Sequence, residues 1–191
     1  MRSLIKKLNR TYRCKMSLEE KIMNAIRDVV DFPKEGIVFK DITPIMMDPT
    51  LSNEIVDALY ERYKDQGIDI VAGIESRGFL FGYPLAMKLG LPFVLIRKKG
   101  KLPYDKISYD YDLEYGSATI EMHTDAIGNK QRVLIHDDLL ATGGSANAAG
   151  QLIEKSGGEV AAFNFLVSLD FLNGEEKLKG FSNNITNFVA Y

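Results

Sequence analysis

The chain has 191 residues, of which 46% are hydrophobic and 26% are charged, and its formal net charge at pH 7 is −2. These values are typical of a globular protein with a substantial core. No apolar run approaches the roughly 18 residues that a membrane-spanning helix needs, and the net charge gives no reason to expect a nucleic-acid partner. One cysteine and two histidines exclude an internal disulfide framework and disfavour a Cys- or His-ligated metal site. We therefore expect a cytoplasmic protein.

Residues 1–15 differ from the rest of the chain because all their charged side chains are basic, namely Arg2, Lys6, Lys7, Arg10, Arg13 and Lys15. The segment lacks the apolar stretch of a secretory signal. Two interpretations stay open: a targeting or RNA-contacting tail, or an extension before a true translation start at Met16, which we prefer. We expect residues 1–15 to be disordered and residues 16–191 to form a single domain.

The first expected helix begins after Ser17. Ser17 and Glu20 have the spacing of a capping box, and apolar residues follow on one helical face as far as Val30. The sequence therefore predicts a helix that ends before Pro33, because the residue preceding a proline disfavours the helical conformation.

Residues 31–44 contain a turn and a short β-run in which Phe39 stands between polar neighbours. From the pattern alone, we interpret Phe39 as a core residue rather than as an aromatic platform for a ligand. Residues 102–115 have no clear period and contain four tyrosines. Their length and irregularity make them a candidate lid.

The remaining elements alternate between strand and helix. In chain order we expect a helix over 51–63, a strand over 68–72, a helix over 79–89, strands over 92–96, 118–122, 133–135 and 160–168, a short helix over 175–179 and a strand over 185–189. This order predicts an α/β fold, with a mainly parallel twisted sheet flanked by helices. Right-handed crossovers bring the turns after residues 72, 96 and 135 to one edge of that sheet.

The stretch 133–145 joins a short apolar strand, the acids Asp137 and Asp138, and a glycine-containing turn that opens a helix. Unpaired backbone N–H groups at the start of a helix bind anions. Either feature alone is common in plain connections and solvated loops. Together they favour a ligand that has a phosphate and also groups that carboxylates hold, such as ribose hydroxyls or a metal ion. Neither the P-loop nor the dinucleotide-binding glycine pattern is present.

Two further turns have the same character. The turn over residues 73–78 contains Arg77 and small polar residues, and residues 97–101 contain four cations in five positions. Such a cationic run is usually a solvated turn. It also lies on the edge where open parallel sheets bind ligands.

The stretch 133–145 resembles the phosphoribosyl pyrophosphate (PRPP) motif of the type I phosphoribosyltransferases. The segments 31–44, 72–79, 95–103 and 113–116 are similar to those of the adenine-using branch of that family. His136 departs from the motif, since an aliphatic strand residue usually stands there. We interpret His136 as a tolerated residue at the edge of the core rather than as a catalyst.

This resemblance implies a fold, an activity and partners. It implies the type I phosphoribosyltransferase fold, with a small N-terminal hood region, and the transfer of the phosphoribosyl group of PRPP to adenine, giving AMP and pyrophosphate in purine salvage. It also implies Mg²⁺ held mainly by substrate and water rather than by protein ligands, no nucleic-acid or membrane partner, and a homodimer.

The resemblance also implies residue roles and reverses the interpretation of Phe39 as core. The implied catalytic residues are Glu114, Asp137 and Asp138. The implied 5′-phosphate residues are Ala141, Thr142, Gly143, Gly144 and Ser145. The implied pyrophosphate residues are Glu75, Ser76, Arg77, Gly78, Arg97, Lys98 and Lys101. Val38, Phe39 and Lys40 are implied to hold adenine, and Tyr115 to lie on the lid.

Two alternatives stay open at this point. A transferase for hypoxanthine, guanine or xanthine has the same PRPP motif but lacks the 31–44 segment. A transcription regulator that senses PRPP on this fold needs roughly 60 or more residues of DNA-binding domain before it. We disfavour the regulator because 30 residues precede Asp31 and because Glu114 is present.

Overall fold

The computed structural model describes residues 16–112 and 117–191. It divides into two compact units, Met1–Ile55 and Val56–Tyr191. No helix in the described ranges is long and apolar enough to cross a lipid bilayer. Residues 1–15 lie outside the described residues, so their expected disorder stays a prediction, as does the single domain over 16–191.

The N-terminal unit contains short elements. These are α2 (Leu18–Ala25), β1 (Arg27–Val30), β2 (Val38–Asp41), α3 (Thr43–Met46) and the first residues of α4 (Pro49–Tyr63). The predicted capping box is confirmed, because Ser17 Oγ accepts from the Glu20 amide at 3.1 Å and the Glu20 carboxylate accepts from the Ser17 amide at 2.8 Å. These two bonds satisfy amides that the first turn of a helix leaves unpaired.

The prediction that this first helix continues to Val30 is wrong. The helix ends at Ala25, and Ile26 has an extended backbone. Residues Arg27–Val30 form a strand antiparallel to β2, with Val29 opposite Phe39 and Val30 opposite Val38. The β-branched Val29 and Val30 favour extended backbone, and pairing with β2 satisfies their backbone groups.

The C-terminal unit is built on one eight-stranded sheet, ordered β10-β8-β7-β3-β4-β6-β5, with β9 also paired to β8. Its strands are β3 (Ile70–Ile74), β4 (Phe93–Lys98), β5 (Lys106–Asp112), β6 (Ser117–His123), β7 (Arg132–Leu140), β8 (Glu159–Ser168), β9 (Ile185–Thr186) and β10 (Val189–Ala190). All pairings are parallel except those of β6, which runs antiparallel to β4 and β5. The predicted mainly parallel α/β fold is confirmed.

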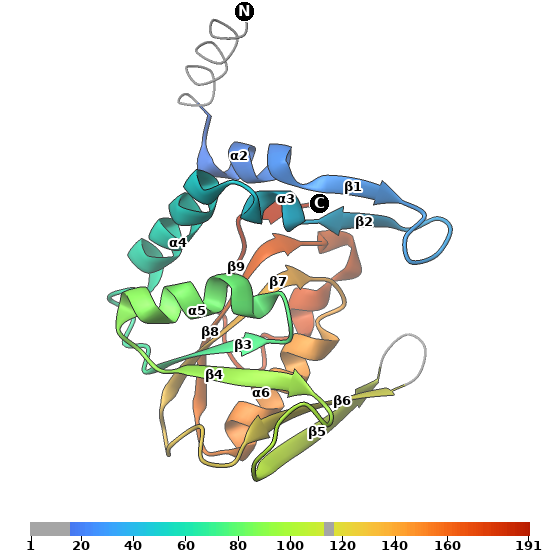
Figure 1. Cartoon of the computed structure of the whole chain (residues 1–191). Helices are drawn as coiled ribbons and strands as arrows, with labels where there is room; N and C mark the ends of the chain where they lie inside the picture. Colours follow the sequence, from blue (N-terminus) through green and yellow to red (C-terminus); the bar gives the residue numbers. More distant parts are fainter. Residues whose placement is uncertain (1–15, 113–116) are drawn as a thin grey trace, which may run out of the picture. The chain divides into compact units, whose positions relative to one another are not determined.

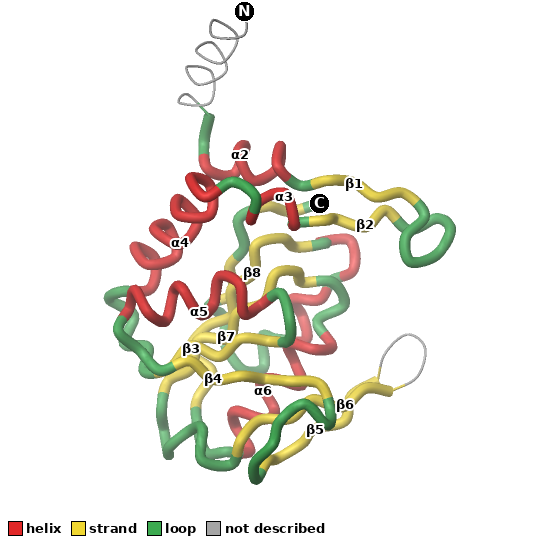
Figure 2. The backbone as a smooth tube through the Cα atoms, in the orientation of Figure 1, coloured by secondary structure: helices red, strands yellow, loops and turns green. Residues whose placement is uncertain are grey.

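Two helices cover opposite faces of this sheet (Figures 1 and 2). Helix α6 (Gly144–Lys155) packs on the face that carries Ala72, Ile96 and Ile135, where the main apolar core lies. Helix α5 (Gly78–Leu89) packs on β3, β4 and β7 from the other side. Because side chains alternate along a strand, neighbouring residues of β7 face different helices.

Three segments differ from the sequence expectation. Residues 102–115 are not mainly irregular, since β5 occupies Lys106–Asp112 and pairs with β6 along its length. The strand expected over 185–189 is the two short strands β9 and β10, and the helix expected over 175–179 is a 3₁₀ turn, η2 (Gly174–Lys177), preceded by η1 (Asp170–Leu172). The alternation of Ile107, Tyr109 and Tyr111, which pack on the core, explains β5. The candidate lid residues 113–116 lie outside the described residues.

Candidate active site

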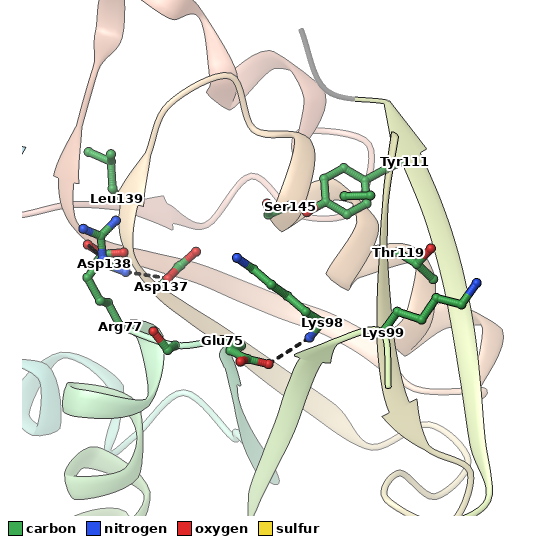
Figure 3. A pocket seen from close by; sticks show the side chains of 12 residues that line it. Glu75, Arg77, Lys98, Lys99, Tyr111, Thr119, Asp137, Asp138, Leu139 and Ser145 are labelled. Carbon is green, nitrogen blue, oxygen red and sulfur yellow. Dashed lines mark hydrogen bonds and ion pairs between the residues drawn. The ribbon is translucent and has the colours of Figure 1, made fainter. Parts of the chain in front are cut away.

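A cleft of about 550 Å³ lies at the carboxyl ends of β3, β4 and β7. These strands are neighbours in the parallel part of the sheet, so the three predicted turns meet there (Figure 3). The lining residues are Glu75, Ser76, Arg77, Lys98, Lys99, Tyr111, Ala118, Thr119, Asp137, Asp138, Leu139 and Ser145. The cleft therefore combines the acid pair Asp137 and Asp138 with a third acid, Glu75, and with several cations and hydroxyl groups on one sheet edge.

The two acids belong to the end of β7, which continues through them to Leu140. Asp138 is 4% exposed and Asp137 is partly buried. Asp137 Oδ1 accepts from the Asp138 amide at 2.9 Å, and Arg77 Nε lies 2.8 Å from Asp138 Oδ2. The contact between Arg77 and Asp138 is an ion pair but not a hydrogen bond, because Asp138 Oδ2 has no hydrogen-bond partner among the described residues.

The pKa values of both acids are raised above the ordinary range. Burial is the main cause at Asp137, and the neighbouring charge of Asp138 adds to it. Burial also raises the pKa of Asp138, and the Arg77 guanidinium partly offsets that effect. A cation or hydroxyl donor that enters the cleft therefore stabilises the ionised form of the pair.

Glu75 organises the cationic side of the cleft. Its carboxylate accepts from the Lys98 amide at 2.9 Å and from Arg97 Nε at 3.2 Å. Burial opposes the charge, but these two donors outweigh it and hold the pKa of Glu75 below its ordinary value. Arg97 also donates to the Lys101 carbonyl at 3.1 Å. Of the three cations implied for pyrophosphate between 97 and 101, only Lys98 lines the cleft.

The orientation of the lysines follows from strand alternation. Figure 3 shows Lys98 extending across the cleft toward Asp137, whereas Lys99 extends the opposite way. The Lys98 amine has no partner among the described residues, so it is available to a ligand anion.

Gly78 lets the turn after β3 approach β7. A Cβ at Gly78 would lie 2.6 Å from the His136 carbonyl oxygen and 3.1 Å from Asp137 Oδ1. The first distance is shorter than side chains tolerate and involves a backbone atom, so a side chain here would force the two segments apart. The Glu75–Ser76 peptide bond in the same turn is cis. Gly78 does not line the cleft, but its contact sets the spacing between Arg77 and the acids.

The glycine turn after β7 forms a second, smaller hollow of about 90 Å³, lined by residues 141–146 with Asp137, Leu139 and Leu140. Asp137 and Ser145 line both cavities, so the two are adjacent. Gly143 has a φ of 74°, and α6 begins at the next residue. No carbonyl in the described ranges accepts from the amides of residues 142–145. The hollow is therefore an anion cradle at a helix N-terminus.

A segment from the C-terminal part of the chain supports this cradle. A Cβ on Gly143 would lie 2.4 Å from the Gly174 carbonyl oxygen, and a Cβ on Gly174 would lie 2.1 Å from the Ala141 carbonyl oxygen. The Asn147 side chain donates to the Lys177 carbonyl at 3.0 Å. Gly174 therefore holds the glycine turn in place, although no motif of the sequence indicated it.

Comparison with known proteins places this geometry in a family. The family model "Phosphoribosyl transferase domain" matches residues 47–186. A curated adenine phosphoribosyltransferase from Cytophaga hutchinsonii is 51% identical over 174 residues, which cover 91% of this chain and 96% of the relative. The chain belongs to the adenine phosphoribosyltransferases. The solved adenine phosphoribosyltransferase from Thermoanaerobacter pseudethanolicus is 46% identical, with a TM-score of 0.87, covering 92% of this chain and 100% of that one.

A second solved adenine phosphoribosyltransferase, from Saccharomyces cerevisiae, is 40% identical with a TM-score of 0.83 and covers 90% of this chain and 98% of that one. That enzyme is complexed with adenine and an imino-altritol bisphosphate.

His136 lies away from the cleft. It is fully buried rather than at the edge of the core, and its Nδ1 lies 2.9 Å from Asn164 Oδ1. Burial lowers the pKa of His136 to about 4, so the ring is neutral at physiological pH. Asn164 Oδ1 only accepts, so Nδ1 carries the proton. A neutral, enclosed ring supports the interpretation of a tolerated residue rather than a catalyst.

The residues implied for adenine lie in the N-terminal unit. Val38 is exposed, and the half-buried Phe39 makes an edge contact with the Phe32 ring, with centroids 5.2 Å apart. The Lys40 amine pairs with Asp28 at 2.7 Å. Glu114 and Tyr115 lie outside the described residues.

Sequence reasoning assigned no individual role to several residues of the cleft, namely Lys99, Tyr111, Ala118, Thr119 and Leu139. The available signal was the alternation of Ile107, Tyr109 and Tyr111, which predicts a strand with these three side chains on one face. Once β5 is placed beside β6, Tyr111 and Thr119 reach the cleft from the antiparallel part of the sheet.

Proposed function

We propose that this chain catalyses the transfer of the phosphoribosyl group of PRPP to adenine, giving AMP and pyrophosphate in purine salvage. The observation that carries the proposal is the cleft in which a buried acid pair joins an unpaired amide cradle and a cationic edge. PRPP offers a matching set of groups: a 5′-phosphate, two ribose hydroxyls and a pyrophosphate. The relatives named above carry this activity in their names.

In this proposal PRPP spans both cavities. Residues 141–145 bind the 5′-phosphate through their amides and hydroxyls. Asp137 and Asp138 accept hydrogen bonds from the ribose hydroxyls. The turn 75–78 and Lys98 bind the pyrophosphate. Arg97 acts through Glu75 rather than by direct contact, since its guanidinium already binds that carboxylate.

Mg²⁺ fits this arrangement as a substrate-held ion. Its preferred ligands are hard oxygens and waters, and the cleft offers the Asp137 and Asp138 carboxylates to ordered water. No group of three metal-ligating side chains occurs in the described ranges. In this proposal the substrate's phosphate oxygens and water would supply most of the coordination. When bound, the ion neutralises charge on the pyrophosphate and makes it a better leaving group.

The reaction breaks the C1′–O bond to pyrophosphate and forms a bond from C1′ to adenine N9. Positive charge develops on the ribose as the first bond weakens. Cations and hydroxyl donors of the bound substrate favour the ionised form of the acid pair, which then stabilises that charge, and burial strengthens the interaction because little water screens it. Arg77 and Lys98 stabilise the negative charge that accumulates on the pyrophosphate.

The family resemblance gives Glu114 and Tyr115 a role at the lid. Glu114 hydrogen-bonds the base and takes part in moving its N9 proton. Exclusion of water by a closed lid prevents hydrolysis of PRPP.

Adenine binds on the β1–β2 ribbon in this proposal. Phe39 stacks on the base, and the backbone of Val38 and Lys40 reads the purine edge. The ribbon supports this, because it places Phe39 and the backbone of its two neighbours on one strand, with Val29 paired opposite Phe39. The Lys40 amine is engaged by Asp28, so its side chain does not compete with the backbone.

We also propose a cytoplasmic homodimer. Leu80, Tyr83 and Met87 are 43%, 54% and 66% exposed and lie along one stripe of α5. An apolar stripe of this kind is typical of a surface that a second copy covers. Sedimentation of wild type and Met87→Glu tests it: we expect a dimer that the charge weakens, and a wild-type monomer contradicts it.

The test of the function is isotopic. The protein is incubated with Mg²⁺, PRPP and one labelled base at a time from adenine, hypoxanthine, guanine and xanthine. We expect labelled AMP from adenine and at least 100-fold less product from the other bases, roughly the discrimination that unpaired polar groups of a base give. Preferred conversion of another base, or no nucleotide from any base, contradicts the proposal.

A further inference from the structure

We propose that Tyr111 is a positioning residue for the 5′-phosphate, acting through the hydroxyl of Ser145. Tyr111 OH lies 3.0 Å from Ser145 Oγ. Tyr111 belongs to β5 and Ser145 to the first turn of α6, so this bond joins the antiparallel hairpin to the anion cradle. Figure 3 shows the two side chains together on the wall of the cleft, away from Arg77 and Asp138. The assignment rests on the proposed function.

The position of Ser145 determines what the bond does. Ser145 lines both the large cleft and the small hollow of residues 141–146, so its hydroxyl stands where the two meet. A hydroxyl has one proton to donate and two lone pairs to accept. In the free protein either hydroxyl of the pair can be the donor.

A phosphate in the cradle fixes the direction of the bond. Phosphate oxygens at neutral pH accept hydrogen bonds, so Ser145 must direct its only proton to the ligand. Its lone pairs are then free to accept from Tyr111. The order Tyr111 to Ser145 to phosphate strengthens each bond, because donation polarises the next hydroxyl in a chain. Tyr111 therefore orients the Ser145 proton toward the ligand.

The ring of Tyr111 is held independently of its hydroxyl. Tyr111 is partly buried and packs against the main core beside Tyr109 and Ile107. Tyr111→Phe therefore removes the hydroxyl and keeps the packing. Tyr109→Phe is a matched control: it lies two residues away on the same face of β5, and its hydroxyl has no hydrogen-bond partner in the described ranges.

The experiment compares wild type, Tyr111→Phe, Tyr109→Phe, Ser145→Ala and the double variant Tyr111→Phe/Ser145→Ala. Steady-state AMP formation gives KM for PRPP and for adenine. Calorimetric titration with ribose 5-phosphate, and separately with pyrophosphate, gives binding without turnover. Thermal unfolding midpoints show whether each variant keeps its fold.

We expect Tyr111→Phe to raise KM for PRPP and Kd for ribose 5-phosphate roughly 3- to 10-fold, the usual effect of one lost hydrogen bond. Pyrophosphate binding, KM for adenine and the unfolding midpoint should match wild type, as should every parameter of Tyr109→Phe. The double variant should bind ribose 5-phosphate as Ser145→Ala does, because Tyr111 acts only through that hydroxyl.

Three results overturn the assignment: ribose 5-phosphate binding to Tyr111→Phe equal to wild type, equal losses for ribose 5-phosphate and pyrophosphate, or additive losses in the double variant. Additive losses mean that Tyr111 contacts the phosphate itself. A fourth combination separates the two proposals. If the wild type makes no AMP but Tyr111→Phe still weakens ribose 5-phosphate binding, the assignment of Tyr111 is supported and the proposed transfer reaction is overturned.

Discussion

The sugar-phosphate cleft and the β1–β2 ribbon are built in different ways. The cleft depends on backbone contacts between distant segments, with Gly78 against β7 and Gly174 against the turn 141–143. The ribbon is two strands joined by a turn, and Phe32, Ile37 and Val38 are 51%, 44% and 47% exposed. Under the proposed function, charged groups bind a rigid, preorganised site, whereas the flat base binds an apolar surface.

Substitution in the acid pair should reduce activity more than any other change proposed here. It tests only the sugar-phosphate side of the comparison. Asp137→Asn keeps the shape of the side chain but removes its charge. We expect kcat/KM for PRPP to fall roughly 10²- to 10³-fold, the usual cost of losing one group that stabilises transition-state charge. Steady-state kinetics with unfolding curves measures this.

The control for the acid is Asp65→Asn, which changes an exposed carboxylate outside the cleft. It should match wild type. Loss of activity in Asp137→Asn together with loss of folding would make the acids structural.

Gly174→Ala tests whether rigidity of the cradle matters. The new methyl group would meet the Ala141 carbonyl, so the turn must shift. We expect KM for PRPP to rise on the order of 10- to 100-fold, because displacements near 1 Å cost about 10²-fold in well-positioned sites. Gly180→Ala is the matched control, since nothing lies within 4 Å of its Cβ. Wild-type kinetics in Gly174→Ala would mean that the cradle is not preorganised.

Phe39→Ala tests the ribbon. Stacking of a base on an aromatic ring contributes about 1–3 kcal/mol, so KM for adenine should rise on the order of 10-fold or more. KM for PRPP should change little. Phe171→Ala, at a ring that is 70% exposed in the other unit, serves as the control. Equal changes in the two KM values would return Phe39 to a core role.

His136 separates stability from activity within the cleft unit. Its pKa is about 4 in the folded chain against an ordinary 6.5, so the unfolded chain binds the extra proton first. The folded state therefore loses stability as the pH falls from 6.5 toward 4, by about 3 kcal/mol in total. In His136→Leu this loss should be absent.

Chemical denaturation of wild type and His136→Leu at pH 7.5 and pH 5 measures the difference. A stability loss of the same size in both proteins would show that another group titrates. AMP formation at pH 7.5 should stay within a few-fold of wild type, since His136 is neutral and outside the cleft.

The sequence was informative where chemistry is local. Asp137, Asp138 and the turn 141–145 stand in one continuous stretch, and parallel topology predicts that it meets the turns after β3 and β4. The helix expected through Val30 failed because Val29 and Val30 continue the apolar face of the helical pattern, although β-branched residues favour extended backbone. Only the partner strand, β2, decides between them.

Contacts between segments distant in the chain could not be predicted from the sequence. The Gly143–Gly174 approach and the Tyr111–Ser145 bond join residues separated by about thirty positions, and neither residue type indicates its partner. Arg97 had the right charge and the right place in the chain, but its guanidinium binds the Glu75 carboxylate and does not line the cleft. Competition of this kind depends on three-dimensional neighbours.

A crystal structure with PRPP and Mg²⁺ bound tests the central claim most directly. The account predicts the 5′-phosphate in the hollow of residues 141–145, the ribose hydroxyls on Asp137 and Asp138, and the pyrophosphate beside Arg77 and Lys98. PRPP bound in the reverse direction, or outside the cleft at the ends of β3, β4 and β7, would contradict it.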